Sequence, residues 1–357
     1  MNNMIYAPVM IITLNRSNHF MRLMESLKRN GWAKYTEIFV GLDYPPSEKY
    51  RSGWEEICTY LEQGDFSVFK DIHVVRRKIN FGAKNNSLDL TRLIYERFDR
   101  VISMEDDLEV SPDFLEYMDK CLDQFKDDPD VIAVSGYSYP IKWNVDTDAN
   151  CFKQNICASM WGIGWWKSKY EKVKFDIETG DLLKRGGDAI KGNIYNRMID
   201  AARIEYVSAI TMPFKRMKKW MLRVCDVSVR PYLAVYDKYI ISPVVSKVRN
   251  HGFDGSGLYC QQIENAAIGN TAGTYNYSNQ PIDNASSFEI RLDDIDTIAA
   301  NRDELNLFDY RSSKQLSRTR CLLWLIKHLG LWSAKIYTIC CLPFDIAKRC
   351  LIKIGRR

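Results

Sequence analysis

The chain has 357 residues, of which 46% are hydrophobic and 27% charged, the composition of a globular protein with room for one large domain or two moderate ones. Its net charge is +5, but residues 314–357 hold ten Lys or Arg against one acid, so this segment carries +9 and the remainder −4. Because the positive charge is confined to this apolar-rich tail, the composition argues against nucleic-acid binding.

The ten cysteines do not predict a disulfide framework, because no Cys-x-x-Cys pair is present and several fall in segments of regular or apolar pattern. The N-terminus lacks a basic region followed by a long apolar core, and no apolar stretch has the length of a membrane span. We expect reduced thiols in a cytoplasmic protein that is peripheral on the inner face of the plasma membrane.

The first 135 residues alternate apolar runs of strand length with stretches of helical periodicity. The predicted strands are Val9–Leu14, Glu37–Leu42, Ile72–Arg76, Arg100–Met104 and Val131–Ser135. The predicted helices are one capped by Ser17 and ended by Gly31, then Glu48–Glu62, Asn85–Phe98 and Pro112–Phe125. This order predicts an α/β fold, a mainly parallel sheet with helices on both faces. No Gly-x-Gly-x-x-Gly follows the first strand, so the dinucleotide-binding fingerprint is absent.

The most informative segment is the acidic run Glu105–Asp107, which follows the predicted strand Arg100–Met104. Soon after it, Ser111 is a good N-cap, Pro112 suits the first helical position, and Asp113 favours the positive end of the helix dipole. Three acids at the end of a buried strand repel one another and are costly to desolvate, unless a cation or ligand hydroxyls share the site. Ligands bind at this edge of parallel sheets, and Asp43 ends another predicted strand there. The run predicts a metal or ligand site; the simpler alternative is a solvated acidic turn.

After about residue 140 the sequence becomes irregular and rich in Trp and Gly. Met160–Lys167 places three Trp beside two Gly, which suits stacking on sugar rings; the alternative is a packed corner of the core. The glycine-rich segment His251–Gly257 predicts a mobile lid or a binding turn.

The tail interleaves large apolar residues, Trp324 and Trp332 among them, with Lys and Arg. This combination favours a helix lying in the interface of an anionic membrane, divided into two pieces at Pro343. The alternative is a basic amphipathic helix packed on its own domain or on a partner.

Together these segments resemble the nucleotide-sugar glycosyltransferases of the GT-A fold. The matching segments are Asn15-Arg16, Asp43, Glu105-Asp106-Asp107 with the following Leu108–Phe114, Gly162–Trp165, Arg230-Pro231, and Pro243–Ser246 leading into Asn250–Gly252. The resemblance is closest to the N-acetylglucosaminyltransferase I type and its bacterial relatives, and it covers roughly residues 7–262. It implies a GT-A-like (Rossmann-like) sheet, followed here by a helical basic tail.

The resemblance also implies roles for the residues at the sheet edge. Arg16 would hold the nucleotide or its diphosphate, and Asp43 would accept a hydrogen bond from the base. Glu105 and Asp106 would meet the ribose and position the sugar. Asp107 would ligate Mn²⁺ or Mg²⁺, which stabilises the departing diphosphate.

Other implied contacts lie beside the donor and the acceptor. Asn80 and Lys84 would line the donor side, or they are plain loop and helix-start residues. Trp161, Gly162 and Trp165 would bind the saccharide acceptor.

An inverting transferase needs one carboxylate to take the proton from the acceptor hydroxyl. Asp226 is our candidate for this base, although the tryptophan often found beside it in the family is missing. Asp200, Glu205 and Asp237 are rivals, and the structural alternative is an acid paired with Arg230.

The expected organisation is a donor-binding half, an acceptor-binding and catalytic half, an irregular extension and a membrane-associating tail, in residues 1–140, 141–265, 266–313 and 314–357. We expect a metal-dependent inverting glycosyltransferase that moves a sugar from a nucleotide-sugar, UDP-linked in our prediction, to a saccharide acceptor, lipid-linked if the tail binds membranes. The expected setting is bacterial surface polysaccharide (O-antigen or capsule) assembly. The alternatives are a nucleotidyltransferase acting on sugar phosphates, whose usual glycine- and lysine-rich phosphate loop is missing, and a non-catalytic carbohydrate-binding protein.

Overall fold

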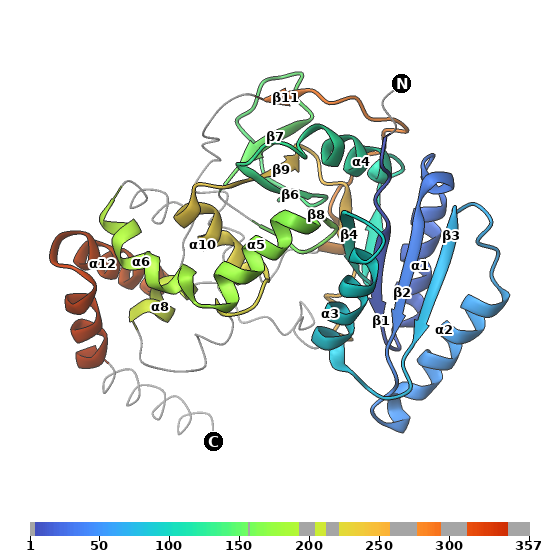
Figure 1. The fold of residues 1–357 in the computed structure, drawn as a ribbon, viewed down its shortest axis with the longest axis horizontal. Helices are drawn as coiled ribbons and strands as arrows, with labels where there is room; N and C mark the ends of the chain where they lie inside the picture. Colours follow the sequence, from blue (N-terminus) through green and yellow to red (C-terminus); the bar gives the residue numbers. More distant parts are fainter. Residues whose placement is uncertain are drawn as a thin grey trace. The chain divides into compact units, whose positions relative to one another are not determined.

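The computed structural model describes residues 4–155, 158–192, 204–211, 221–257, 277–293 and 313–341, and they form two compact units (Figure 1). The first unit comprises residues 1–154, 158–171 and 239–310, and the second comprises residues 155–157, 172–238 and 311–357. Residues 141–265, expected to form one half of the molecule, therefore contribute to both units.

Within the described part of the first unit, nine strands form one sheet in the order β11-β7-β9-β6-β8-β4-β1-β2-β3. The strands are β1 (Val9–Thr13), β2 (Glu37–Leu42), β3 (Asp71–Arg76), β4 (Arg100–Glu105), β6 (Val131–Ser135), β7 (Cys151–Gln154), β8 (Ile163–Trp166), β9 (Tyr239–Pro243) and β11 (Leu292–Asp293). The first four are parallel to one another, whereas β8 is antiparallel to β4 and β6, and β7 to β9. The predicted mainly parallel sheet is confirmed.

Helices cover both faces of this sheet (Figure 1). They are α1 (Ser17–Lys28), α2 (Arg51–Gln63), α3 (Gly82–Tyr95) and α4 (Phe114–Gln124), with short 3-10 turns at Ala33–Tyr35, Glu48–Tyr50 and Tyr277–Asn279. Successive residues of β1 point to opposite faces, as a pleated strand requires. Val9 and Ile11 join the core beneath α1 and α4, whereas Met10 faces α3, where the hydroxyl of Thr91 donates to its Sδ (3.3 Å).

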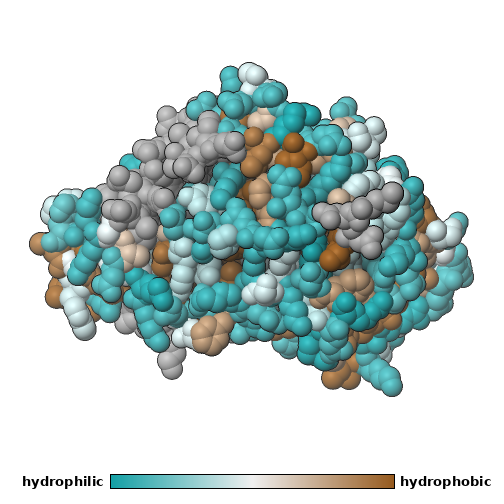
Figure 2. Space-filling model, turned by 45° about the horizontal axis from the view of Figure 1, so that its top comes forward, coloured by the Kyte–Doolittle hydropathy of each residue, from teal (hydrophilic) through white to brown (hydrophobic). Residues whose placement is uncertain are grey.

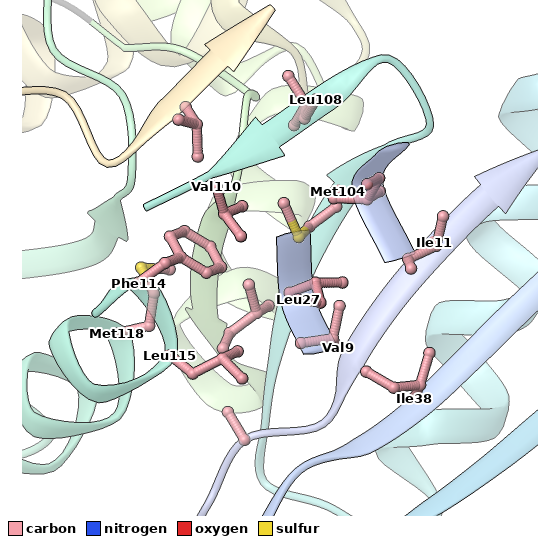
Figure 3. Close-up of a cluster of buried hydrophobic side chains, with 14 of the residues drawn as sticks. Val9, Ile11, Leu27, Ile38, Met104, Leu108, Val110, Phe114, Leu115 and Met118 are labelled. Atoms are coloured by element: carbon pink, nitrogen blue, oxygen red, sulfur yellow. The ribbon is translucent and has the colours of Figure 1, made fainter. Parts of the chain in front are cut away.

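The main core lies between the sheet and the helices α1 and α4, as Figure 3 shows. Val9, Leu27, Met104, Phe114 and Leu115 are at most 2% exposed there. Burying large aliphatic and aromatic side chains stabilises a fold by about 1.5–3 kcal/mol each, so this layer fixes the strands whose ends form the candidate site.

A short strand interrupts the expected passage from the acidic run into a helix. β5 (Leu108–Val110) follows the acids and pairs antiparallel with β10 (Val248–Asn250) in a separate two-stranded sheet. The helix then begins at Phe114 with Asp113 as N-cap, so the prediction of Ser111 as the cap is wrong. The hydroxyl of Ser111 instead donates to the Asp113 carboxylate (2.7 Å).

Residues 277–293, which had no assigned role, are anchored on the first unit. Lys247, only 1% exposed, donates to Asp283 Oδ2 (2.7 Å) and also to Asp113. Gln280 donates to the carbonyl of Ser138 (2.7 Å), and β11 extends the sheet beside β7. A segment far along the chain thus completes the first unit.

In the second unit the described elements are helices. They are α5 (Lys167–Glu178), which begins in the first unit, α6 (Asp181–Lys191), α8 (Ile204–Thr211), α10 (Asp226–Tyr236) and α12 (Ser313–Leu329). α12 packs on α6 and α8 and buries Leu322, Leu323 and Ile326, and residues 331–341 are helical as well. Pro343 lies outside the described residues. No helix in the described ranges is both long and apolar enough to cross a membrane.

Asp119 of α4 makes the stability of the first unit depend on pH. Its carboxylate is buried and accepts a hydrogen bond from the backbone N–H of Ala7 (2.8 Å). Burial raises the pKa of Asp119 to about 8, although that hydrogen bond and the charge of Arg100 favour the ionised form. The folded protein therefore holds a proton here at neutral pH that the unfolded chain releases.

A raised carboxyl pKa stabilises the fold at low pH, and this contribution declines as the pH rises toward the folded-state pKa. Between about pH 4 and 8 the Asp119 contribution should fall by about 1.4 kcal/mol per pH unit. Asp119→Asn mimics the protonated form, so its free energy of unfolding relative to the wild type should increase with pH. Urea unfolding of both proteins at pH 5, 6, 7 and 8 tests this expectation, and parallel pH profiles would contradict it.

Candidate functional site

The candidate site lies where the parallel strands β1, β2 and β4 end. Ile12 is in register with Glu105, and Thr13 with Leu42, so the residues following these strands meet at one edge of the sheet. The backbone N–H of Asp43 donates to the carbonyl of Thr13 (2.9 Å), which fixes the two strand ends together. The structure thus places Asp43 and the acidic run on the same edge, where open α/β sheets bind ligands.

A guanidinium bridges two buried carboxylates at this edge. Arg16 donates from Nη1 to Asp107 Oδ2 (2.8 Å) and from Nη2 to Asp106 Oδ1. Thr13 donates its hydroxyl to the other oxygen of Asp106 (2.8 Å). Asp106 and Asp107 are only 3% and 4% exposed, whereas the Arg16 side chain is 20% exposed. One guanidinium therefore binds two carboxylates that are almost inaccessible to water.

The titration of these groups follows from their burial and pairing. Burial raises the pKa of Asp106, against the opposing effects of Arg16 and Thr13. Burial by itself would lower the pKa of Arg16, but the charges of Asp106 and Asp107 outweigh it and raise that pKa. The guanidinium is therefore permanently charged, as the bridge requires.

The last residue of β10 and the two residues that follow it contact Asp107. The N–H of His251 donates to the Asp107 carbonyl (2.8 Å), and Asn250 Nδ2 lies 3.4 Å from Asp107 Oδ1. The N–H of Gly252 donates to Asn250 Oδ1 (2.7 Å), which holds this amide in place. A Cβ at Gly252 would overlap Asp107 Oδ2 and come within 2.8 Å of Cγ. A side chain here would force the Asp107 carboxylate or the main chain of Gly252 to shift.

The predicted lid or binding turn, His251–Gly257, is fastened at several points. Asp254 Oδ2 lies 2.9 Å from His19 Nε2 of α1. The ring of Phe253 stacks on Tyr277 with ring centroids 4.4 Å apart. His251 pairs with Glu109 (2.8 Å), and this hydrogen bond lowers the pKa of Glu109. In this structure the segment is therefore packed beside Asp107 and Glu109.

Asp43 organises the loop that follows β3. Its carboxylate accepts hydrogen bonds from the N–H groups of Tyr44 (2.9 Å) and Phe81 (2.8 Å), and from Asn80 Nδ2 (3.3 Å). The structure therefore brings Asp43 and Asn80 together, whereas Lys84 is exposed in the first turn of α3. The donor roles of all three residues stay predictions.

The three candidate acceptor residues differ in their surroundings. Gly162 has φ 65°, a left-handed conformation that favours glycine, and its carbonyl accepts from the N–H of Gly136 (2.7 Å). Trp161 is partly buried and meets Phe253 and Tyr277 edge-on, at 5.9 and 5.6 Å between ring centroids.

Trp165 fits the alternative of a packed core residue. It lies in β8, is 3% exposed and contacts Tyr170 edge-on (5.6 Å). Its ring faces are covered by protein, so an acceptor role is better proposed for Trp161 alone.

The candidate base Asp226 belongs to the second unit, whereas the acidic run belongs to the first. Asp226 is the exposed first residue of α10, and Asp237 is the C-cap of the same helix with φ 53°. Asp200 and the side chain of Glu205 lie outside the described residues. The assignment of the base stays a prediction.

A second cluster of metal-binding residue types lies near the amino ends of β2 and β3, away from the strand ends that carry the acid pair. Oxygens of Glu37 and Asp71 and a ring nitrogen of His73 lie within 4.8 Å of one another. Lys70 and Arg97 already donate to Glu37, at 2.9 and 3.0 Å. With two cations on its buried carboxylate, this cluster fits a structural network better than a metal site.

The pair Asp106–Asp107 fits a divalent cation better. It offers carboxylate oxygens, which hard cations prefer, and it carries one more negative than positive charge. Among the described residues, fewer than three His, Cys, Asp or Glu side chains converge there, so water and phosphate oxygens would complete the coordination shell.

A mainly parallel sheet with helices on both faces is an α/β architecture, and here buried acids lie at the carboxyl ends of its strands. Residues 1–169, just under half of the chain, match the GNT-I family. This match supports a glycosyltransferase, the enzyme class that the sequence predicts. No curated protein matches the sequence.

The solved structures that match are only distantly similar to this chain. Residues 1–349 of TarS from S. aureus are 11% identical, over 93% of this chain and 89% of that chain, with a TM-score of 0.36. A longer TarS chain is 13% identical, with a TM-score of 0.32. The match covers 48% of this chain but only 30% of the TarS chain. The mannosyltransferase PcManGT from Pyrobaculum calidifontis, in complex with GDP-Man and Mn²⁺, is 13% identical over 99% of this chain and 81% of that chain, with a TM-score of 0.34. Likenesses this distant carry no conclusion about activity.

The close approach of Gly252 to Asp107 predicts that Gly252→Ala destabilises the first unit. The added Cβ must displace either the Asp107 carboxylate or the main chain, which should lower the free energy of unfolding by about 1–3 kcal/mol. Gly31→Ala is the matched control, because a Cβ at Gly31 meets nothing within 4 Å. Urea unfolding measures both, and equal stabilities of the two variants would show that Gly252 is not packed against the acid.

Proposed function

We propose that the chain is a metal-dependent glycosyltransferase whose donor site is the edge formed by Arg16, Asp43, Glu105, Asp106 and Asp107. It would transfer a sugar from a nucleotide-sugar, UDP-linked in our prediction, to a hydroxyl of a saccharide, with inversion. The observation that carries the proposal is the bridged acid pair at the carboxyl end of β4, within the segment that matches the GNT-I family.

In this proposal each side chain does what its surroundings allow. Asp107 would hold Mn²⁺ or Mg²⁺, which when bound stabilises negative charge on the leaving diphosphate. Arg16 would add a second positive charge to the phosphate oxygens. Asp43 would accept a hydrogen bond from the base of the nucleotide, and Glu105 and Asp106 would orient the ribose and the sugar.

The acceptor side is proposed at Trp161. Its ring, beside the conformationally special Gly162, offers an aromatic surface of the kind that stacks on the apolar faces of sugars. A carboxylate must take the proton of the attacking hydroxyl, and Asp226 remains our candidate for that base.

The donor proposal predicts a specific dependence on Asp107. With Mn²⁺ present, one class among UDP-, GDP- and dTDP-sugars should raise the melting temperature and be hydrolysed slowly without acceptor. Asp107→Asn should abolish the Mn²⁺-dependent shift and reduce this turnover by about 100-fold or more, because charge stabilisation at the diphosphate is lost.

Asp71→Asn is the matched control, since Asp71 belongs to the other cluster of metal-binding residue types. It should leave both readouts unchanged. Undiminished turnover in Asp107→Asn would refute the metal role, and the absence of any nucleotide-sugar response would favour a carbohydrate-binding protein without transferase activity. Release of pyrophosphate from a sugar phosphate and a nucleoside triphosphate would instead indicate a nucleotidyltransferase.

We further propose that the tail places the enzyme on an anionic membrane, which would present a lipid-linked acceptor of bacterial polysaccharide assembly. α12 buries part of its apolar surface on α6 and α8, as the packing alternative expects, but large apolar side chains remain exposed. They are Trp324 and Leu329 on α12, and Trp332, Ile336, Tyr337 and Ile339 on the helical segment 331–341. Figure 2 shows a largely hydrophilic surface, with hydrophobic groups at the left edge where Figure 1 places α12.

The spacing of three of these residues supports the membrane proposal. Trp332, Ile336 and Ile339 recur at helical intervals, so they share one face of the helical segment 331–341. Lys335 lies beside them, its Nζ 4.8 Å from the centre of the Trp332 ring. An apolar face flanked by basic residues suits anionic lipid headgroups.

The double substitution Trp332→Ser and Ile336→Ser should weaken binding to vesicles of phosphatidylglycerol and phosphatidylcholine by about tenfold or more, since each buried apolar side chain contributes about 1.5–3 kcal/mol. Co-sedimentation measures the bound fraction, and vesicles of phosphatidylcholine alone should bind less. Phe175→Ser, which removes a side chain 65% exposed on α5, is the control. Equal binding of the tail variant and the control would contradict the membrane role.

A further inference from the structure

Arg16 engages one of the two carboxylate oxygens with which Asp107 could bind a cation. Its Nη1 lies 2.8 Å from Asp107 Oδ2, and the other oxygen, Oδ1, lies 3.4 Å from Asn250 Nδ2. The main chain at Gly252 closes off Oδ2 on a further side. A cation that binds Oδ2 would therefore compete with the guanidinium for this oxygen.

The charge balance explains why the oxygen is occupied. Asp106 and Asp107 are nearly inaccessible to water, and a buried carboxylate without a cation or donors is strongly destabilising. Arg16 supplies the neutralising charge in this structure. Once a divalent cation neutralises the same acids, Arg16 is no longer needed on them.

The main chain of Arg16 is fixed, so the exchange involves its side chain alone. Arg16 immediately precedes α1, and its carbonyl accepts the N–H of Phe20 (2.9 Å), the first bond of that helix. The side chain is the more exposed member of the ion pair, at 20% against 5% for each acid. The guanidinium can therefore leave Asp107 without a rearrangement of the strands.

We propose that Arg16 and the divalent cation exchange on Asp107, and that the released guanidinium then binds the diphosphate of the donor. This inference rests on the proposed function, which supplies the metal and the diphosphate. It makes Arg16 the residue that couples the two ligands. Metal binding would free Arg16 for the diphosphate, and by thermodynamic reciprocity the diphosphate would favour metal binding by drawing Arg16 away.

The first test measures Mn²⁺ binding in the absence of nucleotide, from the loss of the EPR signal of free Mn²⁺. Arg16→Gln removes the competing cation, so it should bind Mn²⁺ about tenfold more tightly than the wild type, within the range of about 5–150-fold typical of coupled sites. Arg16→Lys, which keeps the charge but cannot bridge two carboxylates, should lie between them.

Arg22→Gln is the matched control for the first test. Arg22 lies on α1, the helix that Arg16 precedes; it is exposed and contacts His19 rather than the acid pair. It should change Mn²⁺ affinity little, so that the loss of one positive charge near the site is separated from the loss of the bridge.

The second test measures binding of UDP, GDP and dTDP without metal by calorimetry. Asp107→Asn weakens the ion pair that keeps Arg16 on residue 107. This variant should therefore bind the preferred nucleotide several-fold more tightly than the wild type, and it should no longer bind Mn²⁺. The double variant Arg16→Gln with Asp107→Asn should lack this gain. This double-mutant cycle distinguishes two causes of tighter nucleotide binding: the freed guanidinium of Arg16, and the loss of repulsion between the Asp107 carboxylate and the diphosphate.

The outcomes distinguish this inference from the proposed function. If Arg16→Gln binds Mn²⁺ no more tightly than the wild type, or if the double variant keeps the nucleotide gain, the exchange is refuted while the donor site stands. If the wild type binds neither Mn²⁺ nor any nucleotide, separately or together, both proposals are overturned. Should Arg16→Gln fail to fold, as circular dichroism would reveal, Arg16→Lys and the nucleotide titration of Asp107→Asn decide the question.

Discussion

The candidate site depends on the pairing of one guanidinium with two buried carboxylates. Parallel register between β1 and β4 carries Arg16 and the pair Asp106–Asp107 to the same sheet edge. The surrounding groups then fix the acids: Thr13 donates to Asp106, and the β10 segment closes around Asp107. Without a positive charge at this point the acids could not remain both ionised and nearly dry.

Local patterns predicted the frame of the first unit well. The strands Glu37–Leu42 and Val131–Ser135 were predicted with the bounds that the structure has, and β1 differs from its prediction by one residue. A continuous apolar run gives a clear signal for a buried parallel strand. The helix predicted at Asn85–Phe98 begins three residues earlier, at Gly82, because polar residues in its first turn carry no apolar periodicity.

Contacts between distant segments could not be predicted in the same way. Arg16 and Asp107 are 91 residues apart, and Asn250 and Asp107 are 143 apart, so no local spacing indicates that they meet. The short strand β5 was missed because its hydrogen-bond partner β10 lies far along the chain. The close approach of Gly252 was missed too, although a glycine following Asn250-His251 was a signal that could have suggested it.

The order of the strands also has a consequence for synthesis of the chain. β9 lies between β7 and β6, and β11 borders β7, yet both segments follow the 67 residues 172–238 that belong to the second unit. During translation β7 therefore has no neighbouring strand of this sheet until residues 239–243 have left the ribosome. Until then, its unpaired edge and the side of β6 that later receives β9 are open to pairing with other chains, and a chaperone that covers nascent strands would act in this interval.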